Sequence, residues 1–150
     1  ACPADTLCLQ QGRFEVTAQW TVGPDTGVAV PHSITPDTGY FWFFQPDNVE
    51  VLVKVLDGCL LNGHFWVFAA GLTNVRTSIT VTDTLLGTSQ TYVNPQGTPF
   101  APIQSTKAQH GPVRLGSRTA VSSGSTVQSG RRRSISPINS ALSNGMRMVV

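Results

Sequence analysis

Apolar and polar residues alternate along several short stretches of this 150-residue chain, and Gly, Pro, Asn and Asp separate the stretches. In residues 13–20 every second side chain is apolar, and residues 75–83 repeat the pattern. Successive side chains of a β-strand point to opposite faces, so this period predicts strands with one buried and one solvent-exposed face. We therefore expect about seven strands in an antiparallel β-sandwich of immunoglobulin-like or jelly-roll connectivity, with no long helix.

Aromatic residues are concentrated in two of the predicted strands. Five of them are consecutive at 40–44, and residues 64–70 contain three more. Bulky side chains in strands usually fill the core, and we expect this role for Trp20, Trp42 and Trp66. If aromatic side chains reach solvent instead, alternate members of a strand point to opposite faces, and the candidate binding aromatics, suited to stacking on sugar rings, are Tyr40, Trp42 and Trp66.

Charge divides the chain near residue 104. Residues 1–104 contain three basic and eight acidic side chains, whereas residues 105–150 contain seven basic side chains and no acidic one. All twelve aromatic residues lie at or before Phe100. A Ser-, Gly- and Arg-rich segment buries too little apolar surface to offset its own ordering entropy. We therefore predict a β-sandwich domain over 1–104 and a basic low-complexity tail over 105–150, disordered alone or ordered by assembly.

The tail contains a cluster of three arginines, Arg131, Arg132 and Arg133. Its positive charge complements the negative body of a neighbouring copy or an acidic polysaccharide, so the cluster is a candidate assembly or anion-binding element. Two short extended-type segments, 119–121 and 146–150, are suited to pairing with a sheet edge. A solvated tail without a partner is the alternative interpretation. No nucleic-acid partner is expected.

Three cysteines leave one without an intramolecular partner. A chain that begins Ala1-Cys2, with low charge and many Ser, Thr and Gly residues, is consistent with a secreted protein whose signal peptide has been removed. The expected disulfide joins Cys8 to Cys59 and closes a long loop. In the chain-entropy model, such a bond stabilises the folded state by about 4 kcal/mol. The alternative is a local Cys2–Cys8 pair. No apolar stretch is long enough to span a membrane.

No residue pattern predicts catalysis, a metal or another cofactor. Asp-Thr-Gly occurs at 25–27 and 37–39, as in aspartic proteases, but a proline precedes each, and both are better explained as turns. His64 follows Asn62-Gly63 and is interpreted as a turn residue at a strand start rather than a general base. The cysteines and histidines lack the spacing of zinc ligands.

Several motifs together carry a family resemblance over residues 2–104. They are Leu-Cys-Leu at 7–9, Gly-Arg-Phe at 12–14, Asp-Thr-Gly-Tyr-Phe-Trp-Phe-Phe at 37–44, Lys-Val-Leu-Asp-Gly at 54–58, Asn-Gly-His-Phe-Trp-Val-Phe at 62–68, Val-Thr-Asp at 81–83 and Tyr-Val-Asn-Pro at 92–95. This part of the chain resembles a β-rich domain of unassigned function that recurs in secreted bacterial proteins. The resemblance implies a secreted module, often attached to larger exported proteins, without established catalytic residues.

The chain departs from that pattern after Gln104. Related domains continue with an Asp-Thr-x-Ala-Phe type ending and a further cysteine, whereas this chain reads Ser-Thr-Lys-Ala-Gln at 105–109. By the resemblance, this departure leaves Cys2 without its expected partner.

Taken together, these features favour a secreted, non-catalytic structural module that self-associates through its tail or an edge strand, as in an extracellular filament or surface layer. The alternative is a module that binds carbohydrate or a cell surface, which requires a solvent-facing aromatic platform. A protease inhibitor or an enzyme is the third hypothesis, and it would require a pocket with convergent polar groups.

Overall fold

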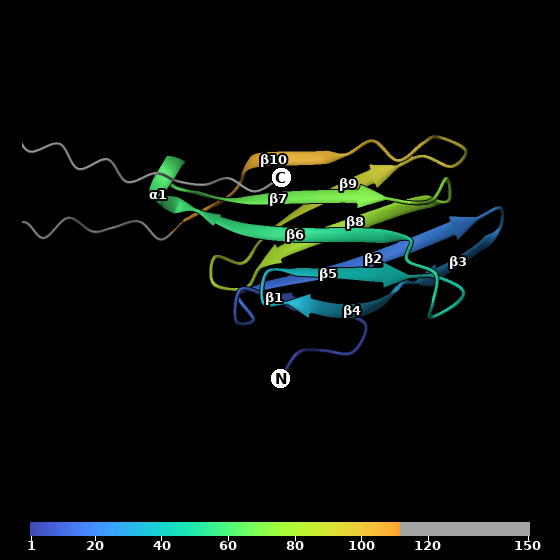
Figure 1. Ribbon diagram of the computed structural model, residues 1–150, viewed down its shortest axis with the longest axis horizontal. Helices are drawn as coiled ribbons and strands as arrows, with labels where there is room; N and C mark the ends of the chain where they lie inside the picture. Colours follow the sequence, from blue (N-terminus) through green and yellow to red (C-terminus); the bar gives the residue numbers. More distant parts are fainter. Residues whose placement is uncertain (112–150) are drawn as a thin grey trace, which may run out of the picture. The chain divides into compact units, whose positions relative to one another are not determined.

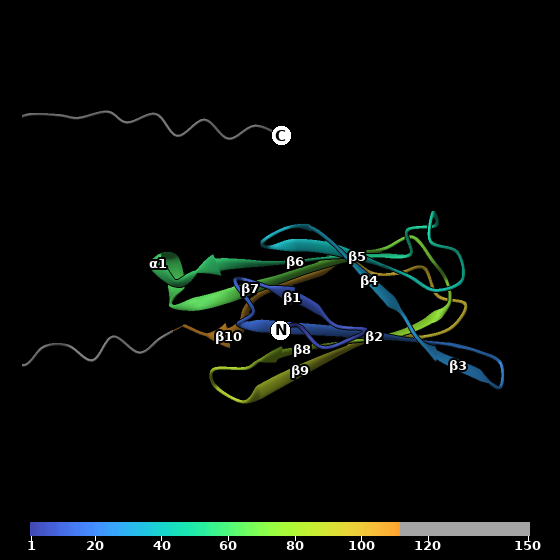
Figure 2. The same cartoon turned by 90° about the horizontal axis from the view of Figure 1, so that it is seen from below.

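The computed structural model describes residues 1–111, which fold into two antiparallel sheets packed face to face (Figures 1 and 2). One sheet, sheet A, has the order β1-β2-β8-β9, with β3 also paired to β2. The other, sheet B, has the order β10-β7-β6-β5-β4. The all-β sandwich predicted from the alternation is confirmed.

The strands of sheet A are β1 (Leu7–Leu9), β2 (Phe14–Val22), β3 (Asp25–Val28), β8 (Arg76–Asp83) and β9 (Thr88–Asn94). The strands of sheet B are β4 (Val30–Thr35), β5 (Thr38–Trp42), β6 (Val51–Gly58), β7 (His64–Gly71) and β10 (Ile103–His110). The chain enters sheet B after β3, since a single buried residue, Ala29, separates β3 from β4 (Figure 2). Strands β4 to β7 then follow one another as a meander.

The core lies between the inner faces of the two sheets. Sheet A contributes Phe14, Val16, Ile79 and Val81, and sheet B contributes Phe41, Val51, Val53, Val55 and Val67; all of these side chains are at most 1% exposed. In β6, buried residues alternate with Leu52, Lys54 and Leu56, which point to the opposite face. The valine spacing of this strand therefore determines which of its side chains meet sheet A.

In the described part of the chain, one short helix interrupts the strands. Helix α1 (Cys59–Asn62) follows β6 directly and ends at Gly63, whose φ of 75° is left-handed, a conformation suited to glycine. No helix within residues 1–111 has the length and apolar character needed to cross a bilayer.

Residues 1–111 contain ten strands, whereas we predicted about seven. Strands β3 and β4 were missed because the segment contains Pro31 and lacks clear alternation. The first Asp-Thr-Gly motif, interpreted as a turn, lies within β3, and the turn itself is at Gly23 and Pro24. Strand β10 extends to His110, so the predicted domain boundary at residue 104 cuts through a strand of sheet B.

The expected Cys8–Cys59 disulfide is wrong, because Cys2 pairs with Cys8 and Cys59 is a free thiol. The reason is the alternation of β1: Leu7 and Leu9 are buried in the core, so the Cys8 side chain points away from it. Cys59 lies at the other sheet, at the start of α1. The thiol left unpaired is thus that of Cys59, not that of Cys2.

Candidate functional site

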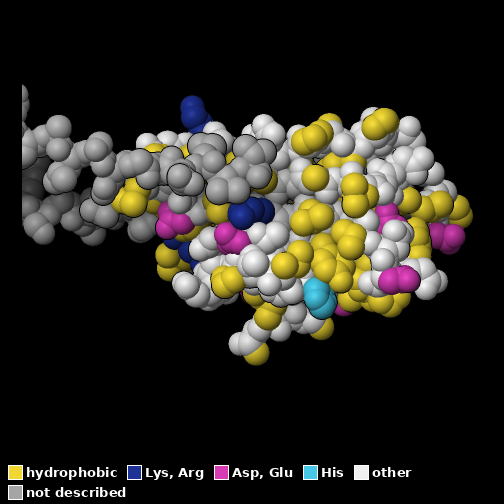
Figure 3. Space-filling view, in the orientation of Figure 1, with side chains coloured by type: hydrophobic (Ala, Val, Ile, Leu, Met, Phe, Trp, Pro, Cys, Tyr) yellow, Lys and Arg dark blue, Asp and Glu magenta, His cyan; other side chains and the backbone are white. Residues whose placement is uncertain are grey.

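The outer face of sheet B bears a group of aromatic side chains. Tyr40 and Trp42 project from β5, and Trp66 and Phe68 project from β7; all four are partly exposed, whereas their neighbours Phe41, Phe65 and Val67 are buried. The aliphatic residues Leu52 and Leu56 of β6 lie between the two pairs. We call these six residues the aromatic face, and Figure 3 shows hydrophobic side chains gathered over β5, β6 and β7.

The strand register fixes where the members of the aromatic face lie. Leu52 pairs with Tyr40 on one side and with Ala70 on the other. Leu56 pairs with Trp66. Because paired residues of antiparallel strands project to the same face, these side chains form cross-strand rows. The three candidate aromatics Tyr40, Trp42 and Trp66 therefore share one surface. Trp42 and Trp66 do not fill the core as we expected.

Trp66 is held in one orientation by its neighbours. Its indole ring lies over Gly58, where a Cβ atom would overlap Nε1 and Cε2 of the ring. Its Nε1 donates a hydrogen bond of 2.9 Å to Oδ1 of Asn62 at the end of α1. Phe68 packs beside it in a T-shaped pair with ring centroids 6.5 Å apart. The ring is consequently fixed before any ligand arrives.

Polar groups lie within and beside the aromatic face. Lys54 of β6 pairs in register with Thr38 and Phe68, and its Nζ is 3.6 Å from Oδ2 of Asp37. Hydrogen bonds from Thr35 and Thr38 lower the pKa of Asp37, with a smaller contribution from the charge of Lys54. The exposed His32 stacks on Tyr40 with ring centroids 4.9 Å apart. These groups provide charges and hydrogen-bonding atoms next to the rings.

A shallow hollow of about 230 Å³ opens on the same face beside β10. Its walls include Leu52, Lys54 and Phe68 of the sheet and Pro102 and Gln104 of the segment that begins β10. Phe68, which sequence reasoning did not select, thus belongs to the candidate site. Its position two residues after Trp66 in the same strand was the available signal.

Trp20 has a different environment. It belongs to β2, packs against the core, and makes an edge contact with Phe44 at 4.8 Å between ring centroids. A Cβ on Gly27 would overlap its ring, so the indole lies against β3. The core role predicted for Trp20 is confirmed.

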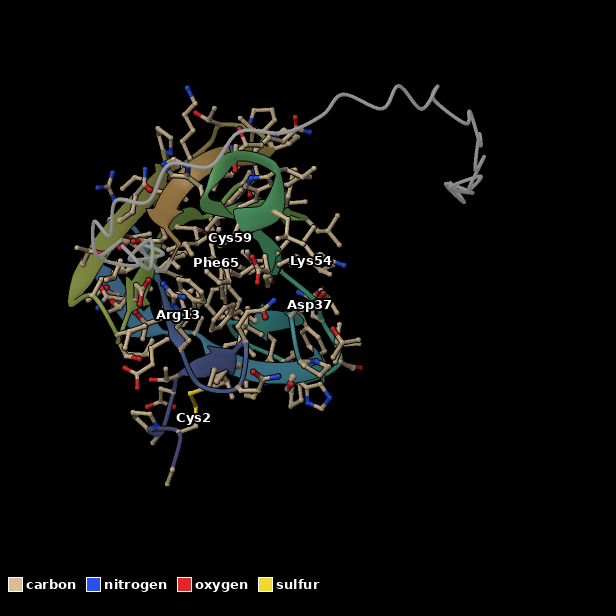
Figure 4. All side chains as sticks on the ribbon, turned by 90° about the vertical axis from the view of Figure 1, so that its left-hand side faces the viewer. Cys2, Arg13, Asp37, Lys54, Cys59 and Phe65 are labelled. Carbon is tan, nitrogen blue, oxygen red and sulfur yellow. A yellow bond between two sulfur atoms is a disulfide. The ribbon has the colours of Figure 1, made fainter. Side chains whose placement is uncertain are left out.

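Arg13 lies at the end of the sandwich that bears α1 (Figure 4), where it forms a buried ion pair with Asp83. Arg13 donates to Asp83 at 2.7 Å, and its guanidinium carbon is 4.3 Å from the ring centroid of Phe65. Asp83 is fully buried and also accepts hydrogen bonds from the backbone N–H groups of Leu85 and Leu86. This pair links the end of β8 to the residue before β2, and we assign it a structural role.

Cys59 lies near this pair (Figure 4). Burial, together with the hydrogen bond and charge of Asp57, raises the pKa of the Cys59 thiol to about 11. A thiol with this pKa is almost entirely protonated at neutral pH and is a poor nucleophile.

Among the residues that the structure describes, the other predicted ones do not form a second site. Asp25 and Asp37 of the two Asp-Thr-Gly motifs belong to strands or turns of different sheets. The cluster of Arg131, Arg132 and Arg133 lies outside the described residues. Within residues 1–111, no group of three or more His, Cys, Asp or Glu side chains is arranged to hold a metal ion.

Comparisons of the chain with protein-family models, with curated proteins and with solved structures found no match.

Proposed function

We propose that this chain is a non-catalytic binding module of an exported protein and that its aromatic face binds carbohydrate. One observation carries the proposal: Tyr40, Trp42, Trp66 and Phe68 are partly exposed on one sheet face, and the Trp66 ring is fixed there by Gly58 and Asn62. Aromatic rings stack on the apolar faces of sugar rings, and a preorganised ring pays little entropy on binding.

The surroundings of the rings suit a sugar better than a purely apolar ligand. Lys54, Asp37 and His32 lie beside the aromatic side chains, and Gln104 lines the adjacent hollow. Ligand sites commonly combine apolar walls with a few polar groups that fix the orientation of the ligand. Sugar hydroxyls would hydrogen-bond to these groups while the rings cover the C–H faces.

Export is part of the same proposal. A Cys2–Cys8 disulfide persists in oxidising compartments and is rarely stable in a reducing cytosol. The family resemblance over residues 2–104 agrees with this location.

The test is a binding screen of the full chain against soluble and insoluble polysaccharides, followed by Trp66→Ala and Trp42→Ala variants with the best ligand. Loss of a stacking ring is expected to weaken binding by about three- to tenfold. The matched control is Phe44→Ala, because Phe44 is an aromatic residue 47% exposed outside the aromatic face. Equal affinities of all three variants, or no binding to any polysaccharide, would exclude the proposal.

We propose self-association as a second function, which the sequence features also favour. The specific observation behind it is β9, an uncharged strand at the edge of sheet A. Unpaired strand edges are common sites of association between chains. Light scattering of the full chain over a range of concentrations tests for association, and a chain that remains monomeric throughout would exclude it.

A further inference from the structure

Strand β9 has one edge whose backbone groups have no strand partner among the described residues. Its seven residues, Thr88–Asn94, pair in continuous register with β8, from Thr88 opposite Asp83 to Asn94 opposite Thr77. Within residues 1–111, no further strand lies beyond it in sheet A, and its backbone makes hydrogen bonds to no backbone outside β8. Its contact with β10 is through side chains, since Thr88 donates a hydrogen bond of 2.8 Å to Gln109. In an antiparallel pair, alternate residues of an edge strand direct their N–H and C=O groups away from the partner. These groups are available to another strand.

The other sheet edges carry features that oppose pairing. Strand β1 has three residues and is tied to Cys2 through its disulfide, and β3 has four residues and begins with Asp25. Strand β4 contains Pro31 and a register irregularity, and β10 contains Lys107 and another irregularity. Proline, charge, bulges and short length are the usual protections of edge strands. Strand β9 has none of them.

The exposed side chains of β9 are compatible with a second copy of themselves. Ser89, Thr91 and Val93 alternate on the outer face of sheet A, and Val93 is 51% exposed. The strand contains no charged residue, so two copies place no like charges opposite each other. Thr91 is the central residue of the strand. An antiparallel pair centred there sets Thr91 opposite its own copy and Ser89 opposite Val93.

The basic segment after residue 111 is a less suitable occupant of this edge. It contains six arginines and no acidic residue, whereas the described part of the chain contains eight acidic and four basic residues. Electrostatic attraction therefore directs the segment to acidic side chains, and β9 has none.

We propose that β9 is a homodimer interface, in which two copies pair edge to edge and antiparallel about a twofold axis, joining their A sheets. The inference rests on the proposed self-association and specifies its contact. It does not depend on carbohydrate binding.

Disulfide trapping of the full chain tests the register. In a Cys59→Ala background, Thr91→Cys is expected to form a covalent dimer under mild oxidation, because opposed residues in antiparallel strands have Cα atoms about 4.5–5.5 Å apart. Ser89→Cys and Val93→Cys are expected to cross-link efficiently only when mixed. The control is Thr80→Cys, since Thr80 lies on the same outer face but on the interior strand β8.

A charge at the edge tests the interface without cysteines. Thr91→Lys is expected to weaken dimerisation at least tenfold in sedimentation equilibrium, and Thr80→Lys is expected to leave it unchanged. The control is matched because Thr80 and Thr91 share one hydroxyl–hydroxyl hydrogen bond of 2.9 Å, which either substitution removes.

Three results would overturn the proposal, and they differ in what else they affect. If Thr91→Cys cross-links no faster than Thr80→Cys while the chains still associate, the β9 interface is rejected but self-association is not. Association that survives Thr91→Lys and disappears when the chain ends at Gly111 assigns the contact to the basic segment. A full chain that is monomeric at every concentration rejects both the interface and self-association.

Discussion

The indole ring of Trp66 occupies the space that a side chain at position 58 would fill. Gly58 and Trp66 lie on adjacent strands of sheet B, and Gly58 is buried although it faces outward, because the ring covers it. The glycine is therefore part of the candidate binding surface.

Gly58→Ala is expected to lower the free energy of unfolding by about 1–3 kcal/mol, since the new methyl group overpacks the site. The same substitution in a Trp66→Ala background should cost at least about 1 kcal/mol less. A residual cost is expected there, because the Cβ also approaches the carbonyl oxygen of His64 at 2.8 Å. Urea denaturation of the four chains of this cycle is the measurement. Equal costs in both backgrounds would contradict the assigned contact.

The Arg13–Asp83 pair predicts an acid-sensitive contribution to stability. Burial alone would raise the pKa of Asp83, but hydrogen bonds from Arg13 and from the backbone of Leu86 and Leu85 hold it below the ordinary value of 3.8. A lowered folded-state pKa means that the stabilisation is complete above pH 3.8 and is lost as the pH falls through the folded-state value.

Asp83→Ala should cost about 3–5 kcal/mol at pH 7, because it leaves the Arg13 cation without its carboxylate. The difference in unfolding free energy between wild type and variant should shrink below about pH 4. Denaturation curves between pH 7 and pH 2.5 measure it. The control is Asp47→Ala, a substitution of an exposed carboxylate outside this pair. A difference that is independent of pH would contradict the assignment.

Cys59 should react slowly with thiol reagents in the folded protein. Raising its pKa from 9.0 to about 11 reduces the thiolate fraction about a hundredfold, and the thiolate is the reactive form. Native protein is expected to show little labelling by iodoacetamide at pH 7.5, whereas unfolded, unreduced protein shows one reactive thiol per chain. Rapid labelling of the native state would indicate that the thiol is more exposed than described.

Gly111→Cys is expected to form a disulfide with Cys59. A Cβ placed on Gly111 lies 3.3 Å from the Cβ of Cys59, close to the range that disulfides adopt. The bridge closes a loop of about 50 residues and should stabilise by up to about 4 kcal/mol in the chain-entropy model. Mass spectrometry detects the bond, and melting with and without reductant measures its effect. The same substitution with Cys59→Ala serves as the control.

Removal of the native disulfide should have a smaller effect. The Cys2–Cys8 bridge closes only a short local loop, for which the chain-entropy model gives about 2 kcal/mol. A Cys2→Ser/Cys8→Ser variant is expected to remain folded, with circular dichroism like that of the wild type and a modestly lower melting temperature. Complete unfolding of the variant would show that the bridge holds more of the fold than β1.

The alternation of residues predicted β2, β6, β7 and β8, because each buries one face. It did not predict β10, because the Gln, Ser, Thr and Lys residues of this strand match the polar composition of the predicted tail. That segment forms a strand because β7 offers it an edge. The cysteine pairing was predictable from β1, where buried Leu7 and Leu9 turn Cys8 outward.

The candidate site was only partly predictable. Tyr40 and Trp42 are two positions apart in one strand, so the alternation of side chains places them on the same face. Whether that face contacts solvent depends on sheet A, which covers one side of sheet B. The contact between Arg13 and Asp83 joins residues 70 positions apart, and no local sequence pattern predicts it.

The position of β9 has a consequence for how tightly such a module would hold a surface. Strand β9 belongs to sheet A, while the aromatic face belongs to sheet B. A twofold axis that pairs two edge strands antiparallel is perpendicular to their sheet, so both aromatic faces point in the same direction. The pair is then divalent, and a polymer bound by one copy meets the second at high effective concentration, so that two weak contacts act as one strong attachment.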